Sequence, residues 1–193
     1  PSILGAAVFP FVFEKLGNKG HTAALFSAGT GVSLIALYFF SAVSAPVPFY
    51  TFAALSQFFF CGFNTAIYAI VPDCVEYGEW KTGIRAEGSV YTGYTFSRKI
   101  SAALAGFLPG IMLAQIGYVP HAVQSAGTLL GLRQLIFLWP CGLAIVAAVT
   151  MGLFYKLNEA RFAFIIEEIG KRKKQTANTP EITTNNKASA VTL

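Results

Sequence analysis

Long uncharged apolar runs alternate with short polar connectors along most of the chain. An α-helix rises 1.5 Å per residue, so about 20 apolar residues cross the hydrocarbon core of a bilayer. The pattern therefore predicts an all-α, multi-pass membrane protein. The predicted crossings are residues 22–44, 49–71, 89–116 and 129–155, preceded by the end of a truncated crossing at residues 3–13. Because Pro1 opens the chain partway into an apolar run, we expect the C-terminal part of a longer protein.

Composition agrees with this interpretation. The chain of 193 residues is 54% hydrophobic and only 12% charged, with a mean hydropathy of +0.57, whereas soluble domains carry about 25% charged residues. The net charge of +5 does not indicate nucleic acid, because most of the cations lie in connectors and in the tail. The three cysteines match no metal or redox spacing, so we expect free thiols and no metal site.

The distribution of Lys and Arg predicts the orientation in the membrane. Lys15, Lys19, Lys81 and Arg85 lie in connectors on one side, and the tail after residue 155 adds seven more cations. The connectors on the other side, residues 45–48 and 117–127, contain none. Since cytoplasmic loops are enriched in Lys and Arg, the C-terminus is predicted to be cytoplasmic.

The tail divides into two predicted segments. Residues 156–174 have the pattern of a cytoplasmic amphipathic helix that Asn158 can cap, with a basic end suited to anionic lipid. Its apolar positions are Phe162, Ile165, Ile166 and Ile169. The alternative is a solvated tail. Residues 175–193, rich in Thr, Asn and Ala, are predicted to be disordered.

Two adjacent cations, Arg98 and Lys99, interrupt the crossing at residues 89–116. Lys99 would lie about 15 Å from the start of that helix, near the middle of the bilayer. Insertion of Lys or Arg there costs roughly 2.5–3.5 kcal/mol, and such residues usually face a watery path or a partner. We interpret the pair as part of a substrate path; snorkelling or a structural ion pair is the alternative.

The same helix carries a polar stripe beside these cations. Thr92, Thr95 and Lys99 share one face, and Tyr91, Tyr94 and Arg98 form the adjoining one. The preceding helix presents Gln57, Cys61, Asn64 and Tyr68 on one face. Hydroxyl and amide groups beside an aromatic ring suit a sugar, which needs hydrogen bonds for its hydroxyls and a flat surface for its C–H face. A plain helix–helix interface would use similar residues.

Residues 72–88 form a polar connector with four carboxylates and two cations. Asp73, Glu76 and Arg85 are predicted to form salt bridges that open and close a cytoplasmic gate. Asp73, Glu76 and Glu79 could instead ligate a hard cation or act as acid–base groups, but no His joins them. His21 and His121 lie on opposite sides of the predicted membrane.

The motifs DCVEYGEWKTGIRAEG, YTGYTFSRK and GYVPHAVQS resemble the glycoside–pentoside–hexuronide:cation symporters of the major facilitator superfamily. The resemblance extends to about Lys174. It implies the C-terminal part of a twelve-helix fold, from a partial helix 8 to helix 12, in a bacterial inner membrane. It also implies partnership with membrane lipid and with a missing N-terminal half. No cofactor is expected.

The coupling cation implied by this resemblance is Na⁺ or H⁺. Transporters coupled to these ions usually carry an intramembrane carboxylate, and no predicted crossing from residue 22 onward contains Asp or Glu. We therefore expect the cation site outside this chain.

Within this family the chain is most similar to members that import sulfoquinovose, a glucose with a sulfonate at carbon 6. The resemblance implies sugar-side roles for Tyr94, Thr95 and Lys99, and we hypothesise that Arg98 helps to neutralise the sulfonate. Asn64 occupies the position of a sugar-facing Trp in the melibiose permease, so Tyr68, one turn on, is the alternative source of an aromatic ring.

The predicted function is secondary-active, cation-coupled import of this sugar by alternating access. Alternatives within transport are a permease for another anionic sugar, such as a glucuronide, and an exporter of a short-chain sulfonate. A membrane-embedded enzyme using Asp73, Glu76 and Glu79, and a non-transporting scaffold, are the alternatives of other classes.

Overall fold

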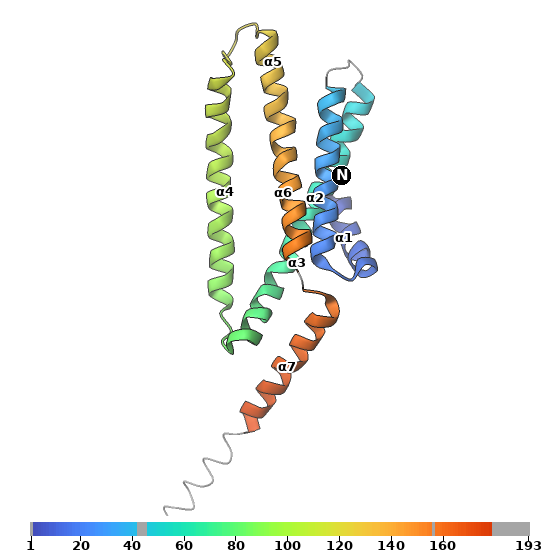
Figure 1. Ribbon diagram of the computed structural model, residues 1–193, viewed down its shortest axis with the longest axis vertical. Helices are drawn as coiled ribbons and strands as arrows, with labels where there is room; N and C mark the ends of the chain where they lie inside the picture. Colours follow the sequence, from blue (N-terminus) through green and yellow to red (C-terminus); the bar gives the residue numbers. More distant parts are fainter. Residues whose placement is uncertain (1, 42–45, 156, 179–193) are drawn as a thin grey trace, which may run out of the picture.

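The computed structural model describes residues 2–41, 46–155 and 157–178 (Figure 1). These ranges are helical with short connections and contain no strand, which confirms the predicted all-α class. The elements are α1 (Ser2–Leu16), α2 (Lys19–Phe40), α3 (Pro46–Thr82), α4 (Glu87–Gln115), α5 (Ala126–Arg133), the π-helical segment η1 (Gln134–Leu138), α6 (Trp139–Phe154) and α7 (Glu159–Asn178).

Within the described ranges, three stretches are long and apolar enough to cross a membrane, judged by length and composition. They are Lys19–Phe40, Pro46–Thr82 and Ala126–Phe154, the last of which combines α5, η1 and α6. They correspond to the predicted crossings 22–44, 49–71 and 129–155. Helix α4 corresponds to the predicted crossing 89–116 and is 29 residues long, but it is not among the three. Its two cations and its hydroxyl-bearing first half lower its mean hydropathy.

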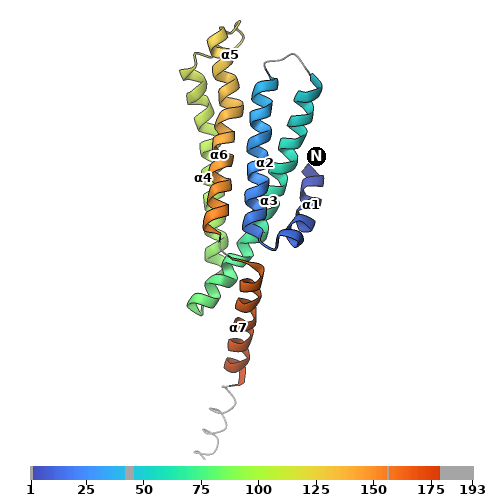
Figure 2. The same ribbon diagram turned by 45° about the vertical axis from the view of Figure 1, so that its right-hand side comes forward.

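The two ends of the bundle differ in what they carry. We call the end that holds the α1–α2 turn, the connection between α3 and α4, and α7 the α7 end; it lies at the bottom of Figure 1. The opposite end, where α4 connects to α5, is the α5 end. In Figure 2 the long helices still run side by side between these two ends.

Only Gly17 and Asn18 separate α1 from α2, within the short basic turn seen in the sequence. Gly17 adopts a left-handed conformation with φ of +62°, which glycine tolerates without steric cost. Asn18 then caps α2, because its side-chain oxygen accepts hydrogen bonds from the backbone N–H groups of Gly20 at 2.9 Å and His21 at 3.2 Å. The turn is therefore tight, and it places Lys19 in the first turn of α2.

The expected connector at residues 72–88 is largely helical. Helix α3 continues past Pro72 to Thr82, so only residues 83–86 separate it from α4. Proline removes one backbone hydrogen bond from a helix, but Asp73, Val75 and Glu79 beyond it are buried. Packing of these side chains holds the last turns in place, and the carboxylates project from a helix instead of a loop.

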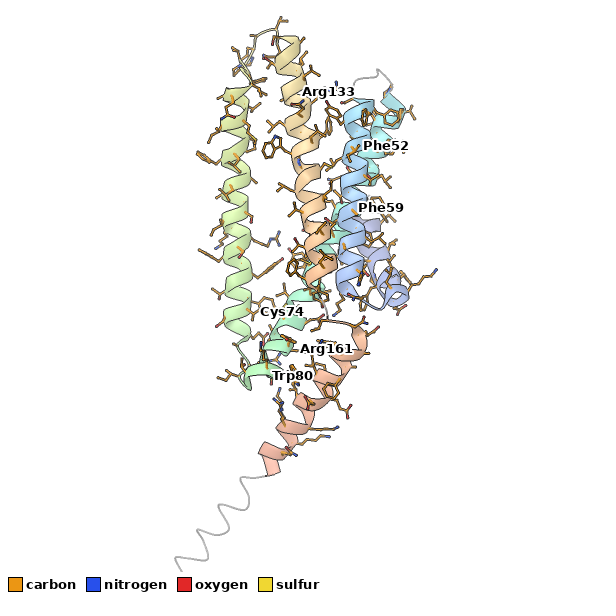
Figure 3. All side chains as sticks on the ribbon, in the orientation of Figure 1. Phe52, Phe59, Cys74, Trp80, Arg133 and Arg161 are labelled. Carbon is orange, nitrogen blue, oxygen red and sulfur yellow. The ribbon has the colours of Figure 1, made fainter. Side chains whose placement is uncertain are left out.

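The hydrophobic core lies where α1, α2 and α3 meet. Phe9 from α1, Phe26 from α2 and Ala66 from α3 are buried there. The Phe26 ring centroid lies 6.2 Å from that of Phe9 and 6.1 Å from that of Phe59, distances typical of favourable aromatic pairs. Figure 3 shows Phe59 at this level of the bundle.

Glycine allows α3 to approach the Phe26 ring closely. A Cβ atom added to Gly62 would lie 2.3 Å from that ring, so no larger residue fits without displacing it. Small residues at helix contacts are the usual means of close packing in membrane bundles.

Helix α4 stands apart from this core. None of its residues, all of which the structure describes, is buried. Ala102, Gly106 and Gly110 are small residues at the four-residue spacing typical of close helix packing, but a Cβ atom added to either glycine meets no described atom within 4 Å. Figure 1 shows α4 alongside α6 and connected to the rest of the chain at its two ends. This helix exposes its polar stripe.

Helix α7 packs against the end of α3. Ile165 and Ile169 are buried, the Trp80 indole N–H donates to Glu168, and Lys173 Nζ lies 2.7 Å from Glu79 Oε1. The helix extends to Asn178, so residues 175–178 of the segment predicted to be disordered are helical. Residues 179–193 lie outside the described residues. The placement of this helix on the inner leaflet stays a prediction.

Replacing Gly62 with Ala should lower the thermal stability of the purified protein, because the new methyl group collides with the buried Phe26 ring. Overpacking of this kind costs typically about 1–3 kcal/mol. Gly152→Ala is the matched control, since its Cβ would lie 3.7 Å from Ala24, an ordinary contact. The measurement is the midpoint of thermal unfolding in detergent. Equal midpoints for the two variants would contradict the packing described here.

Candidate functional site

Arg98 on α4 reaches across to α3. Its Nη1 donates hydrogen bonds to the hydroxyl oxygen of Tyr68 and, at 3.4 Å, to that of Tyr94. The guanidinium carbon lies 5.4 Å and 5.8 Å from the centroids of the two rings, close enough for cation–π attraction. We call Arg98, Tyr68 and Tyr94 the Arg98 cluster. It brings together three of the residues that the sequence predicted for a substrate site.

The Arg98 cluster leaves donor capacity unused. Arginine carries five N–H groups in a planar fork, and only Nη1 of Arg98 has an acceptor among the described residues. The side chain is exposed. A guanidinium held from one side can bind two oxygens of a carboxylate, sulfonate or phosphate with its other N–H groups. The arrangement suits an anion.

Lys99 faces a separate surface hollow on α4. The hollow has a volume of about 370 Å³ and is lined by Tyr91, Thr92, Thr95, Phe96 and Lys99. Thr95 donates its hydroxyl to the Tyr91 carbonyl at 2.7 Å, which leaves its oxygen free to accept. In the described ranges no carboxylate pairs with Lys99. The predicted face of Thr92, Thr95 and Lys99 is thus one surface, which adjoins Arg98 but does not contain it.

The polar face predicted on α3 is divided between two places. Tyr68 joins the Arg98 cluster, whereas Gln57 lines a cavity of about 630 Å³ between α2, α3, α4 and α6, together with Phe60 and Ser101. Asn64 lines neither of these sites; its side-chain amide donates to the Phe60 carbonyl of its own helix at 3.0 Å.

A buried ion pair lies at the α7 end. Lys19 Nζ lies 2.7 Å from both carboxylate oxygens of Asp73, which is only 4% exposed. The Tyr155 hydroxyl donates to the same carboxylate at 3.1 Å. The Lys19 ammonium also lies 5.6 Å from the Phe13 ring and 5.1 Å from the Phe162 ring. Asp73, predicted at a gate, is therefore neutralised by a residue of α2, not by Arg85.

Arg85 belongs to a second ionic network. Its Nη1 lies 2.9 Å from Glu79 Oε2, and its Nε lies 3.3 Å from Glu87. The hydrogen bond to Glu79, followed by that to Glu87, raises the pKa of the Arg85 guanidinium above its ordinary value. Lys173 of α7 binds the other oxygen of Glu79. Glu76, the third predicted gate residue, is half-buried on α3 and has no ion pair with any described residue.

Sequence reasoning missed the structural role of three residues. From the sequence alone, Lys19 is a connector charge that indicates orientation, and Tyr155 is the end of an apolar run. Arg133, labelled in Figure 3, donates Nε to Ser41 at 2.9 Å and lies 5.0 Å from the Tyr38 ring. It ties the start of η1 to the end of α2. A charge in or beside an apolar run was the available signal, but its partner is far away in the sequence.

The cysteines and carboxylates offer no metal centre in the part of the chain that the structure describes. Cys61, Cys74 and Cys141 are free.

Comparison with known proteins extends the interpretation. The chain is 70% identical over 145 residues to the "Putative sulfoquinovose importer" of Salmonella typhimurium, covering 75% of this chain and 30% of that protein. It is 54% identical over 194 residues to the protein of the same name in Escherichia coli, covering 99% of this chain and 39% of that protein. It is also 57% identical over 136 residues to the "Putative 2,3-dihydroxypropane-1-sulfonate exporter" of Salmonella typhimurium, covering 70% of this chain and 29% of that protein.

The chain therefore spans less than two fifths of the length of these relatives. Residues 1–159 match the family described as MFS/sugar transport protein. This match covers nearly all of the helical bundle and confirms the resemblance seen in the motifs. The chain belongs to the sugar transport proteins of the major facilitator superfamily.

Proposed function

We propose that this chain is the C-terminal part of a cation-coupled transporter that imports sulfoquinovose across the bacterial inner membrane by alternating access. The names of two relatives support this substrate, and the name of a third also contains a sulfonate. The observation that carries the proposal is the pair of exposed cations, Arg98 and Lys99, on a membrane-length helix without buried residues. Cations near the middle of a bilayer, where this helix would place them, need water or an anion beside them.

The chemistry of a sulfonate matches these two side chains. Its three oxygens can accept a forked pair of hydrogen bonds from Arg98 and a further one from the ammonium of Lys99. Thr95 and Tyr94 lie on the same helix and offer hydroxyls to the sugar. From α3, Tyr68 offers a hydroxyl and Asn64 the oxygen of its side-chain amide. We assign these six residues to substrate binding.

Direction and coupling rest on the resemblance. The second candidate, export of a short-chain sulfonate, is favoured by the relative named as an exporter, and the role of Arg98 is the same in both cases. The coupling cation is assigned to the part of the protein outside this chain. Membership of a transport family argues against the enzyme alternative, as do the ion pairs that hold Asp73 and Glu79.

The gate is assigned to the α7 end, on the predicted cytoplasmic side. Asp73, Glu76 and Arg85 remain its proposed members, and the structure adds Lys19 and Glu79 as the partners of two of them. The Lys19–Asp73 pair joins α2 to α3, and the Arg85–Glu79 pair joins the connection before α4 to the last turn of α3, so movements of α2 and of this connection relative to α3 can make and break them.

Replacing Arg98 with Gln should lower sulfoquinovose exchange at least about tenfold, because a hydrogen bond to a charged group contributes about 1.5–3 kcal/mol. Counterflow of labelled sugar in vesicles that contain the full-length transporter is the measurement. Competition by glucose, which lacks the sulfonate, should change little. Tyr68→Phe, which removes one hydroxyl that holds Arg98, should give an intermediate loss.

Equal effects of Arg98→Gln on the sulfonated and the neutral sugar would reject the sulfonate assignment. Unchanged uptake by Lys99→Ala would reject the role of Lys99 in substrate binding.

Asp73→Asn should destabilise the transporter, because it leaves the half-buried ammonium of Lys19 without a counter-charge. Breaking a buried pair costs on the order of 3 kcal/mol. Thermal unfolding in detergent measures the loss, and Lys15→Gln, which removes an exposed cation of the same region, is the control. Exchanging the two residues, Lys19→Asp with Asp73→Lys, should recover part of the stability. A midpoint unchanged from the wild type would show that the pair contributes nothing.

A further inference from the structure

A second cavity, outside the Arg98 cluster, lies at the foot of α6. Its volume is about 470 Å³, within the range of ligand sites. We call it the foot cavity. Its walls come from α3, from the end of α6 and from the start of α7, and are formed by Asp73, Cys74, Tyr77, Phe154, Tyr155, Leu157 and Arg161. Figure 3 labels Cys74 on α3 and Arg161 on α7 at this level. It shares Asp73 with the proposed gate, but none of the residues assigned to substrate binding lines it.

The charges around the foot cavity favour an anion. Its one lining carboxylate, Asp73, is already paired with Lys19 and accepts from Tyr155. Arg161 is exposed and makes no hydrogen bond or ion pair with any residue in the described ranges. Glu159, at the start of α7, lines a neighbouring cavity that also contains Lys19. The unpaired guanidinium therefore lines a cavity whose one lining carboxylate is already neutralised.

The position of the foot cavity points to the membrane. The apolar span that includes α6 ends at Phe154, so the cavity lies where hydrocarbon gives way to the polar surface. Phe154 is 79% exposed, and Val146, Val149 and Leu153 form an exposed apolar stripe on α6 that leads to it. A ligand here meets hydrocarbon on one side and a cation on the other.

We propose that the foot cavity binds an anionic glycerophospholipid. Its phosphate receives hydrogen bonds from Arg161 and from the Tyr77 hydroxyl, and its acyl chains lie along the apolar stripe of α6. Arginine suits a phosphodiester because its planar fork binds two oxygens. A soluble phosphate would leave Phe154 and Leu157 without a function, so the apolar wall favours a lipid.

Native mass spectrometry of the full-length transporter, delipidated in detergent and titrated with phosphatidylglycerol, tests the proposal. Arg161→Gln should weaken binding about tenfold, the effect of losing charge-assisted hydrogen bonds. Lys174→Gln is the matched control, because it removes an equal charge from the same helix away from the cavity. It should change binding less than about twofold.

Two further arms separate the lipid from other ligands. Dioleoylglycerol, which has chains but no phosphate, should bind the wild type and Arg161→Gln equally. Inorganic phosphate should not displace phosphatidylglycerol. Equal lipid binding by Arg161→Gln and Lys174→Gln would overturn the site, and displacement by inorganic phosphate would overturn the choice of a lipid. Sugar transport is not measured, so this result and that for Arg98 are independent.

Discussion

The contact among Lys19, Asp73 and Tyr155 holds together the α7 end of the bundle. A carboxylate that is 4% exposed would be strongly disfavoured without a counter-charge. Here it has an ammonium at 2.7 Å and a phenol at 3.1 Å. Since the three residues come from the start of α2, from α3 and from the end of α6, neutralising one charge holds three helices together at this end. The tight turn at Gly17 and Asn18 follows from the same requirement, because it delivers Lys19 to this position.

The two cations of α4 have different surroundings from Lys19, which is paired with a carboxylate. Arg98 donates a hydrogen bond to a tyrosine hydroxyl and lies near two tyrosine rings, with no carboxylate partner among the described residues. Lys99 has no carboxylate partner in the described part of the chain either. Both positive charges therefore remain available to an incoming anion. A protein that needed these residues only for stability would be expected to neutralise them, as it does Lys19.

Much of this arrangement could be predicted from the sequence. Apolar runs of membrane length predicted the long helices, and helical spacing predicted the face of Thr92, Thr95 and Lys99. Pairings between distant elements could not be predicted. Lys19 and Asp73 are 54 residues apart, and nothing local distinguishes Lys19 from a cation that only sets orientation.

The sequence predicts a connector after Pro72, whereas α3 continues to Thr82, and the physical reason is related. Proline predicts the end of a helix from local preference, but burial of Val75 and Glu79 against neighbouring elements outweighs that preference. Tertiary packing decides the length of this helix.

The distribution of contacts also indicates which element can move. Lys19 and Asp73 belong to α2 and α3, which share the core around Phe26. Helix α4 shares no core with that bundle, and its side-chain contacts to α3 include the hydrogen bond from Arg98 to Tyr68 and the packing of the Tyr94 ring on the Tyr68 ring. An anion that binds the free N–H groups of Arg98 therefore lies at the contact between α4 and α3. If the proposed function is correct, substrate binding and the position of α4 are therefore linked, because a ligand shifts a conformational equilibrium by its differential affinity for the two states.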